Sequence, residues 1–114
     1  MVYTNPYMRE AWENMSDASR MEGAAGHAAV KSALQSAGAL IASAALQEPV
    51  TAKVVSRSSS TDGPFAETKE HLAGFYLIEV ASEAEALEWA ARMPEAEFGM
   101  VEVRPIRDLS AYGL

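Results

Sequence analysis

The chain has 114 residues, a length that suits one domain and is too short for two. It contains no cysteine, which excludes a disulfide framework, a thiol nucleophile and a cysteine-ligated metal, and its two histidines leave little for a zinc site. The net charge is −7, and the nine Lys and Arg residues are scattered rather than clustered. We therefore expect no nucleic-acid partner and no anionic membrane surface, because both need clustered cations.

We expect neither a secretory signal at the amino end nor a segment that spans a membrane. The amino end lacks the charged and apolar regions of a secretory signal, and the longest apolar run, residues 37–46, is too short to span a bilayer. We expect a cytoplasmic protein without a cofactor, folded as one domain over residues 1–114. Residues 107–114 are expected to form a C-terminal tail.

The first predicted elements are a strand and a helix. Residues 2–3 read as a stub of strand, stopped by the Asn-Pro pair that follows. Ser16 is a good N-cap for a helix that runs to about residue 37 and ends at Gly38. Gly23 and Gly26 each cost about 1 kcal/mol of helix propensity relative to Ala. In return they leave a thin helix that can lie close against a sheet.

The rest of the chain is predicted as strands, turns and a second helix. In chain order these are a strand over 39–46, a strand over 51–57, a turn and loop over 58–64, a strand over 74–80, a helix from Ser82 to about Met93, and a strand over 100–104. Ser82 and Glu85 form a capping box at the start of this helix. The order indicates an α+β fold of the ferredoxin-like type, βαββαβ, with two helices on one face of an antiparallel sheet.

The strand over 74–80 is apolar on both faces. Tyr76, Ile78 and Val80 lie on one face, and Phe75 and Leu77 lie on the other. Such a strand is normally covered on both faces. Since the two helices cover one face, we expect a second copy to cover the other in a homodimer. The alternative is a monomer with a partly exposed apolar groove.

Two runs of residues carry a resemblance to a known family. Residues 62–70 read Asp-Gly-Pro-Phe-Ala-Glu-Thr-Lys-Glu, and residues 74–78 read Gly-Phe-Tyr-Leu-Ile. With residues 86–91 and 101–105, they resemble the DGPF branch of the YCII-related proteins over residues 3–106. This resemblance implies the dimeric α+β barrel superfamily, in which two ferredoxin-like sheets pack face to face. Some members are encoded with or fused to extracytoplasmic-function sigma factors, which implies a sigma-factor-related partner.

The amino end departs from these relatives. They usually begin with a full apolar strand, whereas this chain has only Met1 and Val2 ahead of Tyr3. We predict a stub of about three residues or a swapped strand, and a start codon further upstream would explain the difference.

His27 is the main candidate for chemistry. On the predicted helix it precedes Val30 and Leu34 by three and seven residues, so it should point with them toward the sheet. A buried imidazole beside a carboxylate can transfer protons at neutral pH. The relatives carry a histidine before the same helix ending, Leu-x-x-x-Gly, which Leu34 and Gly38 match here. There it is thought to pair with an aspartate as an acid/base dyad. The alternative is a core histidine held by one hydrogen bond.

An acidic partner for His27 has to come from a different position than in the relatives. In the relatives the aspartate lies just before the proline that follows the second helix, whereas here Met93 precedes Pro94. We therefore expect Asp62, on the Asp-Gly-Pro turn, to be the partner if His27 has one.

Ser43, Phe65 and Tyr76 are the candidate ligand-binding residues. Phe65 follows the constrained turn, which is either a structural latch or the rim of a pocket, and aromatic residues in a small domain often belong to the core or a dimer interface. We expect a domain that binds a small molecule in a cleft near His27. One alternative is an acid/base enzyme of the isomerase or lyase type that uses His27. Another is a regulatory partner in sigma-factor signalling.

Overall fold

The protein is described from a computed structural model, in which residues 1–64 and 70–114 are described. The main elements are β1 (Val2–Thr4), α1 (Pro6–Glu13), α2 (Asp17–Ser36), β2 (Leu40–Ala45), β3 (Lys53–Val55), β4 (Ser60–Asp62), β5 (His71–Ile78) and α3 (Glu83–Ala91). Short 3₁₀ turns occupy Pro49–Thr51, Pro94–Phe98 and Ser110–Tyr112.

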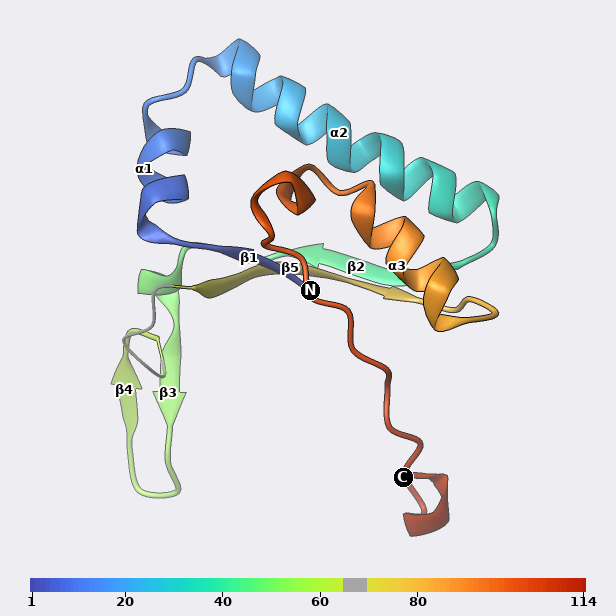
Figure 1. Cartoon of the computed structure of the whole chain (residues 1–114). Helices are drawn as coiled ribbons and strands as arrows, with labels where there is room; N and C mark the ends of the chain where they lie inside the picture. Colours follow the sequence, from blue (N-terminus) through green and yellow to red (C-terminus); the bar gives the residue numbers. More distant parts are fainter. Residues whose placement is uncertain (65–69) are drawn as a thin grey trace.

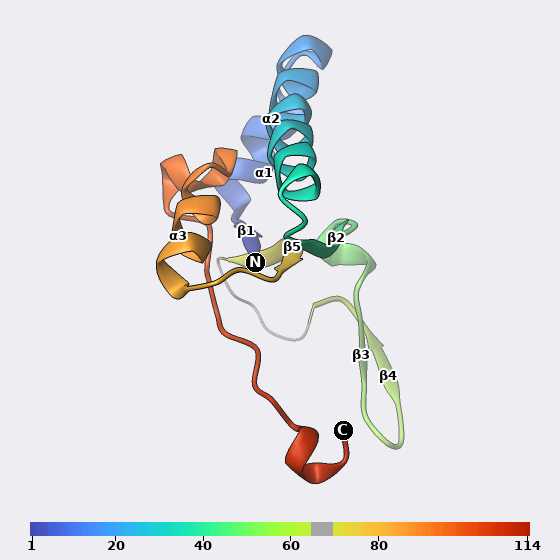
Figure 2. The same ribbon diagram turned by 90° about the vertical axis from the view of Figure 1, so that its right-hand side faces the viewer.

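The main sheet is antiparallel and has the order β1-β5-β2. A bridge between Val2 and Val101 places the last extended segment on the far side of β1. Helices α2 and α3 lie together on one face of this sheet (Figures 1 and 2). The mixed α+β architecture is therefore confirmed and is consistent with the ferredoxin-like arrangement. The strand predicted over 100–104 is reduced to that bridge.

Strand β1 is a stub of three residues, as predicted for the amino end. Its pairing with β5 ends where Val2 faces Gly74. A side chain at Gly74 would not fit, because its Cβ would lie 2.7 Å from the carbonyl oxygen of Ala44 on β2. This glycine lets the three strands pass close together at the centre of the sheet.

Helix α1 was not predicted, because the Asn-Pro pair was read only as a stop. The side chain of Asn5 accepts a backbone N–H of the first turn at 2.8 Å, and Pro6 takes the first helical position. At the other end, Arg20 of α2 donates to the carbonyl oxygens of Trp12 at 2.9 Å and Glu13 at 3.0 Å. Both ends of this short helix are therefore capped by side chains.

Strands β3 and β4 pair only with each other and form a ribbon outside the main sheet. The ribbon projects away from the helices (Figure 1). The strand predicted over 51–57 is present in shortened form, but the prediction of only turn and loop over 58–64 was wrong, because residues 60–62 form β4. The turn between the strands closes through backbone hydrogen bonds between Ser56 and Ser59.

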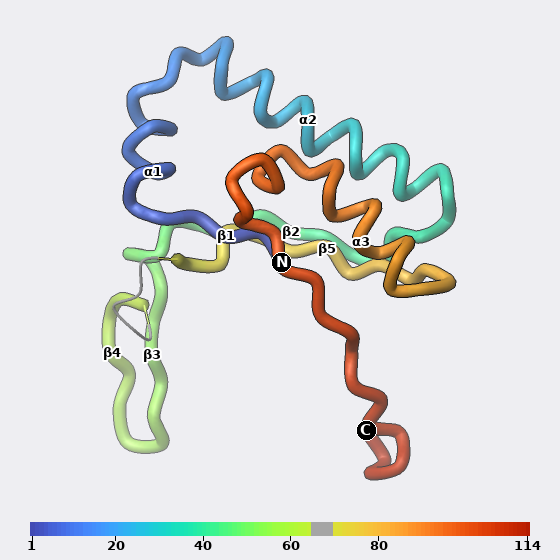
Figure 3. The backbone as a smooth tube through the Cα atoms, in the orientation of Figure 1, coloured from blue at the N-terminus to red at the C-terminus, as the bar shows by residue number. Residues whose placement is uncertain are grey.

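The core lies between the two helices and the sheet. It is formed by Val30, Leu34, Ala39 and Met93, with Leu40, Tyr76, Ile78, Val80, Trp89 and Val101 packed against it. The inward stripe predicted for the long helix is confirmed, since Leu34 is fully buried. The tube in Figure 3 shows that the carboxyl-terminal segment leaves this core and runs away from the helices.

Candidate functional site

His27 points from α2 toward the sheet, as predicted, and meets two polar side chains. Its Nε2 lies 2.7 Å from Oε1 of Glu95, and its Nδ1 lies 2.9 Å from the hydroxyl oxygen of Tyr76. The rings of His27 and Tyr76 are nearly parallel, with an interplanar angle of 12° and centroids 6.1 Å apart. The side chain of His27 keeps 30% of its surface exposed, so a ligand can reach it.

The ionisation of Glu95 sets the direction of these hydrogen bonds. Burial acts to raise the pKa of Glu95, but hydrogen bonds from His27 and the backbone and the charge of protonated His27 together hold the pKa below its ordinary value. Glu95 is therefore an ionised acceptor at neutral pH, and the Nε2–H of His27 donates to it. In the neutral imidazole Nδ1 is then the acceptor, and the hydroxyl of Tyr76 donates to it.

Tyr76 remains a phenol under ordinary conditions. It lies on β5 and packs toward the core from the helix side of the sheet. Burial first, and the negative charge of Glu95 second, raise the pKa of Tyr76 above its ordinary value. The hydroxyl is therefore a proton donor that loses its proton only when a base such as His27 accepts it.

Local backbone features bring His27 and Glu95 together. Pro94 opens the 3₁₀ turn that follows α3, and this turn carries Glu95. A Cβ at Gly26, the residue before His27, would lie 2.9 Å from Cγ of Pro94. The turn can therefore lie against α2 only because Gly26 has no side chain, which is the close approach expected of a thin helix.

A cavity of about 750 Å³ lies beside these residues, between α1, α2 and the strands β1, β2 and β5. His27, Tyr76 and Glu95 line it, and so does Ser43, which pairs with Tyr76 across β2 and β5. Arg9 of α1 also lines it. Two of the ligand-binding candidates from the sequence therefore share one cavity with His27.

Two atoms at this cavity are buried without a hydrogen-bond partner in the described part of the chain. They are Nη1 of Arg9 and Oε2 of Glu95. Buried polar atoms are nearly always hydrogen-bonded in folded proteins, so this donor and this acceptor lack the partner that such atoms normally have.

The other candidates from the sequence lie elsewhere. Asp62 is on β4, where it forms an exposed ion pair with Lys53, so the acidic partner of His27 is Glu95 and not Asp62. Phe65 lies outside the described residues. Within residues 1–64 and 70–114, no group of three or more His, Asp or Glu side chains is placed to hold a metal ion.

Glu95 and Arg9 were not singled out from the sequence. Glu95 directly follows Pro94, one position beyond this proline, whereas the relatives' aspartate is one position before it. An acidic residue on either side of that proline was the available signal. Arg9 depends on α1, and the Asn5-Pro6 capping pattern was the signal for that helix.

Comparison with known proteins agrees with this architecture. The family model of the YCII-related domain matches residues 2–110. The chain belongs to the YCII-related family. It is also 49% identical over 65 residues to the uncharacterized protein R00369 of Rhizobium meliloti (strain 1021), a match that covers 51% of this chain and 52% of that protein. This YCII-related chain thus aligns with about half the length of that relative. None of its described helices is long and apolar enough to cross a membrane.

Proposed function

We propose that this YCII-related domain binds a small molecule in the cavity beside His27 and transfers protons to and from it. The observation that carries the proposal is the continuous hydrogen-bonded chain from Tyr76 through His27 to Glu95, which lines a cavity of about 750 Å³. A nucleophile or acid next to an imidazole that is itself held by a carboxylate is a recurrent catalytic arrangement.

Each of the three groups has a separate role in this proposal. Glu95 holds the imidazole in the tautomer with Nε2–H and stabilises the imidazolium when it forms. His27 accepts the phenolic proton at Nδ1, and the resulting phenolate of Tyr76 removes a proton from the ligand. Return of the proton from His27 to a different ligand atom completes an isomerisation. In an elimination, His27 instead gives its proton to the group that leaves the neighbouring ligand atom, and both outcomes suit the isomerase or lyase type.

The expected ligand carries an anionic group. Arg9 lines the same cavity, and its Nη1 lacks a hydrogen-bond partner among the described residues. A guanidinium binds carboxylate or phosphate oxygens well, because its donors match their geometry. Small carboxylates and phosphate esters are therefore the first compounds to test.

The test is a thermal-shift screen of such metabolites, followed by NMR of each stabilising compound with the protein in D₂O. We expect deuterium to enter the compound, and replacement of His27 by Gln or Tyr76 by Phe to slow this exchange by about 10²–10⁴-fold. The matched control is His71→Gln, which removes the second histidine at the start of β5, outside the cavity. It should leave the rate unchanged.

Two results would contradict acid/base catalysis. An exchange rate that survives His27→Gln would remove His27 from the mechanism. Binding without any exchange would assign the cavity to a ligand-binding or regulatory domain, including the sigma-factor-related partner that the family resemblance implies. Ser43→Ala would then be expected to weaken binding, since Ser43 lines the cavity.

The domain is further proposed to act as a homodimer. Phe75 and Leu77 alternate with the core-facing Tyr76 and Ile78 on β5, so they lie on the face of the sheet opposite α2 and α3. Ile41 on β2 is 58% exposed in the single chain. A second sheet packed against this face would remove these apolar side chains from water.

A further inference from the structure

Helix α1 forms one wall of the His27 cavity. Met8, Arg9 and Trp12 line the cavity and lie on one face of the helix, one and four residues apart. Tyr7, on another face, is 80% exposed, and none of the eight residues of α1, all in the described part of the chain, is buried. A segment that buries so little opens at a low free energy, so α1 can move while the core stays folded.

The segments on both sides of α1 are anchored. Before it, the backbone N–H of Tyr3 on β1 donates to the carbonyl oxygen of Met100 at 2.9 Å. After it, residues 14–16 lead directly into α2, where the side chain of Ser16 accepts the backbone N–H of Ser19. Figure 1 shows α1 between β1 and α2 at one end of the sheet. The helix can therefore rock against the cavity but stays attached at both ends.

Arg20 of α2 holds the carboxyl end of α1 in its present position. Its Nε and Nη2 donate to the carbonyl oxygens of Trp12 and Glu13 at 2.9 and 3.0 Å. Its guanidinium also lies over the ring of Trp12, 5.4 Å from the ring centroid. These hydrogen bonds are exposed, so water competes for the same groups and each bond adds only modestly to stability. They hold α1 in place and can break without unfolding the chain.

The charges of α1 are sorted between the cavity and the solvent. Arg9 is partly buried and lines the cavity, whereas Glu10 and Glu13 are exposed. Lys31 of α2 lines the same cavity. In a chain with a net charge of −7, this arrangement directs the positive charge of α1 inward. An anion that binds Arg9 inside the cavity links α1 to the rest of the protein and so favours the position of α1 that closes on it.

We propose that α1 is a lid on the His27 cavity, that Arg20 is the latch that holds the lid, and that Arg9 closes the lid on a carboxylate or phosphate group of the ligand. Closure excludes water from His27 and Tyr76 while the ligand is bound. The inference rests on the proposed function for the place where the ligand binds, but it does not depend on proton transfer.

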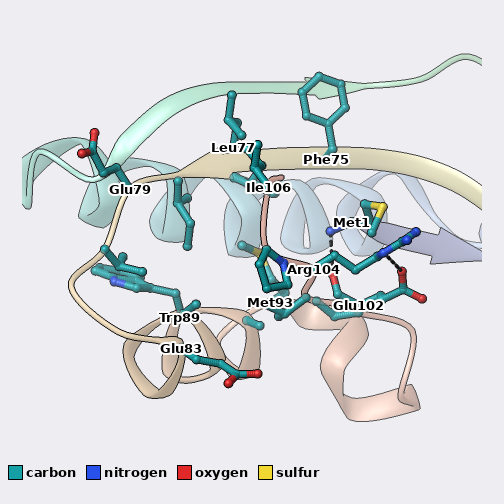
Figure 4. A pocket seen from close by; sticks show the side chains of 18 of the residues that line it. Met1, Phe75, Leu77, Glu79, Glu83, Trp89, Met93, Glu102, Arg104 and Ile106 are labelled. Atoms are coloured by element: carbon teal, nitrogen blue, oxygen red, sulfur yellow. Dashed lines mark hydrogen bonds and ion pairs between the residues drawn. The ribbon is translucent and has the colours of Figure 1, made fainter. Parts of the chain in front are cut away.

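The test follows the fluorescence of Trp12, which is 43% exposed, in the full chain carrying Trp89→Phe. Trp89, the second tryptophan, lies on α3 and lines a different cavity (Figure 4). None of the described residues that line that cavity belongs to α1, so the substitution leaves the lid intact. Inorganic phosphate and acetate are added separately, with sodium chloride at matched ionic strength as the control, and quenching of Trp12 by acrylamide is measured.

We expect phosphate or acetate, but not chloride, to lower the quenching constant of Trp12 with saturation. The anion that acts identifies the group that Arg9 binds. Hydrogen exchange of residues 6–13 in the chain with both tryptophans provides the same readout if Trp89→Phe folds poorly, and we expect the active anion to slow it.

Two variants separate the closing group from the latch. Arg9→Met should weaken binding of the anion by about tenfold or more and leave the quenching constant without the anion unchanged. Arg20→Met should raise the quenching constant without the anion, and saturating anion should lower it again, because Arg9 is still present. Arg57→Met is the matched control, since it removes an exposed arginine between β3 and β4 and should change neither value.

Three results would overturn the lid. They are quenching of Trp12 that responds to phosphate and acetate no more than to chloride, an unchanged anion response in Arg9→Met, and an unchanged quenching constant in Arg20→Met without the anion. His27→Gln should keep the anion response. A lid that closes in a chain that exchanges no ligand proton would contradict only the proposed proton transfer. Proton exchange without any closure would contradict only the lid.

Discussion

At the scale of single residues, the chemistry of this chain rests on the pairing of His27 with Glu95. The imidazole would be only a core histidine if it met a single backbone acceptor. Instead its two nitrogens meet a phenol and a carboxylate at 2.9 and 2.7 Å. Glu95, two positions after Met93, supplies the carboxylate that His27 meets in this chain.

The lowered pKa of Glu95 predicts a pH dependence of stability. A carboxyl group whose pKa is lower in the folded than in the unfolded state stabilises the fold above the unfolded value, near 4.3, and this contribution is lost as the pH falls through the folded value. Acid titration of the free energy of unfolding should therefore show a steeper loss below about pH 4.3 in the wild type than in Glu95→Gln. For this half-buried group we expect a difference of up to about 1 kcal/mol.

The controls for this titration are two further variants. His27→Gln should also flatten the acid dependence, because the hydrogen bond from His27 is among the causes that lower the pKa of Glu95. Glu88→Gln, on the exposed face of α3, should leave it unchanged. An equally steep acid loss in Glu95→Gln would show that other carboxylates account for it.

At the scale of elements, α2 is shaped by where its glycines lie. Gly26 is the closest point of approach to Pro94, whereas a Cβ at Gly23 would meet only Trp12 at an ordinary 3.9 Å. The two glycines cost the helix the same propensity, but only one of them is required by packing. This contrast gives a matched pair of substitutions on one helix.

Gly23→Ala should stabilise the protein by about 0.5–1 kcal/mol, because it restores helix propensity and its Cβ makes only an ordinary contact with Trp12. Gly26→Ala should give no such gain, because its Cβ would lie 2.9 Å from Cγ of Pro94 and push away the turn that carries Glu95. Denaturant unfolding measures both variants. Equal stabilisation by the two substitutions would mean that the turn moves freely and that Gly26 does not position Glu95. A second readout is the acid dependence described above, which Gly26→Ala should weaken.

At the scale of the whole molecule, the described residues cover the sheet on one face only. Figure 2 shows α2 and α3 on one side, while the β3–β4 ribbon and the carboxyl-terminal segment descend on the other without forming a layer over it. A chain of this length has a small core, with five buried apolar residues among those described. Covering the open face therefore offers a large gain in buried apolar surface.

Sedimentation equilibrium at micromolar concentration should return about twice the chain mass of 12.2 kDa. Ile41→Glu should shift the population toward the monomer, because it places a charge on an exposed apolar position of β2. Met21→Glu is the matched control, since Met21 is 72% exposed on α2, on the helix side of the sheet. A wild-type mass near 12 kDa would contradict the dimer and leave the open face as a site for another partner.

What the sequence determined by itself is the local part of this protein. The caps at Ser16 and Ser82, the helical phase of His27, Val30 and Leu34, and the short first strand all follow from near neighbours in the chain, because capping and periodicity act over one or two turns. The capping signal for α1 was equally local and was simply misread. The α+β order then follows from the sequence of these elements.

Only the tertiary structure decided which residues His27 meets. Tyr76 is 49 positions and Glu95 68 positions away in the chain, and no local pattern encodes such a contact. The sequence predicted Asp62 as the acidic partner of His27 because Asp62 lies in a constrained turn. That turn belongs to the β3–β4 ribbon, which lies outside the main sheet. The pairing of β3 with β4, and the approach of α2 to Pro94 through Gly26, depend on how completed elements pack. Residues that are distant in the chain come into contact only when the helices pack on the sheet. The partners of His27 therefore depend on tertiary packing and not on local sequence.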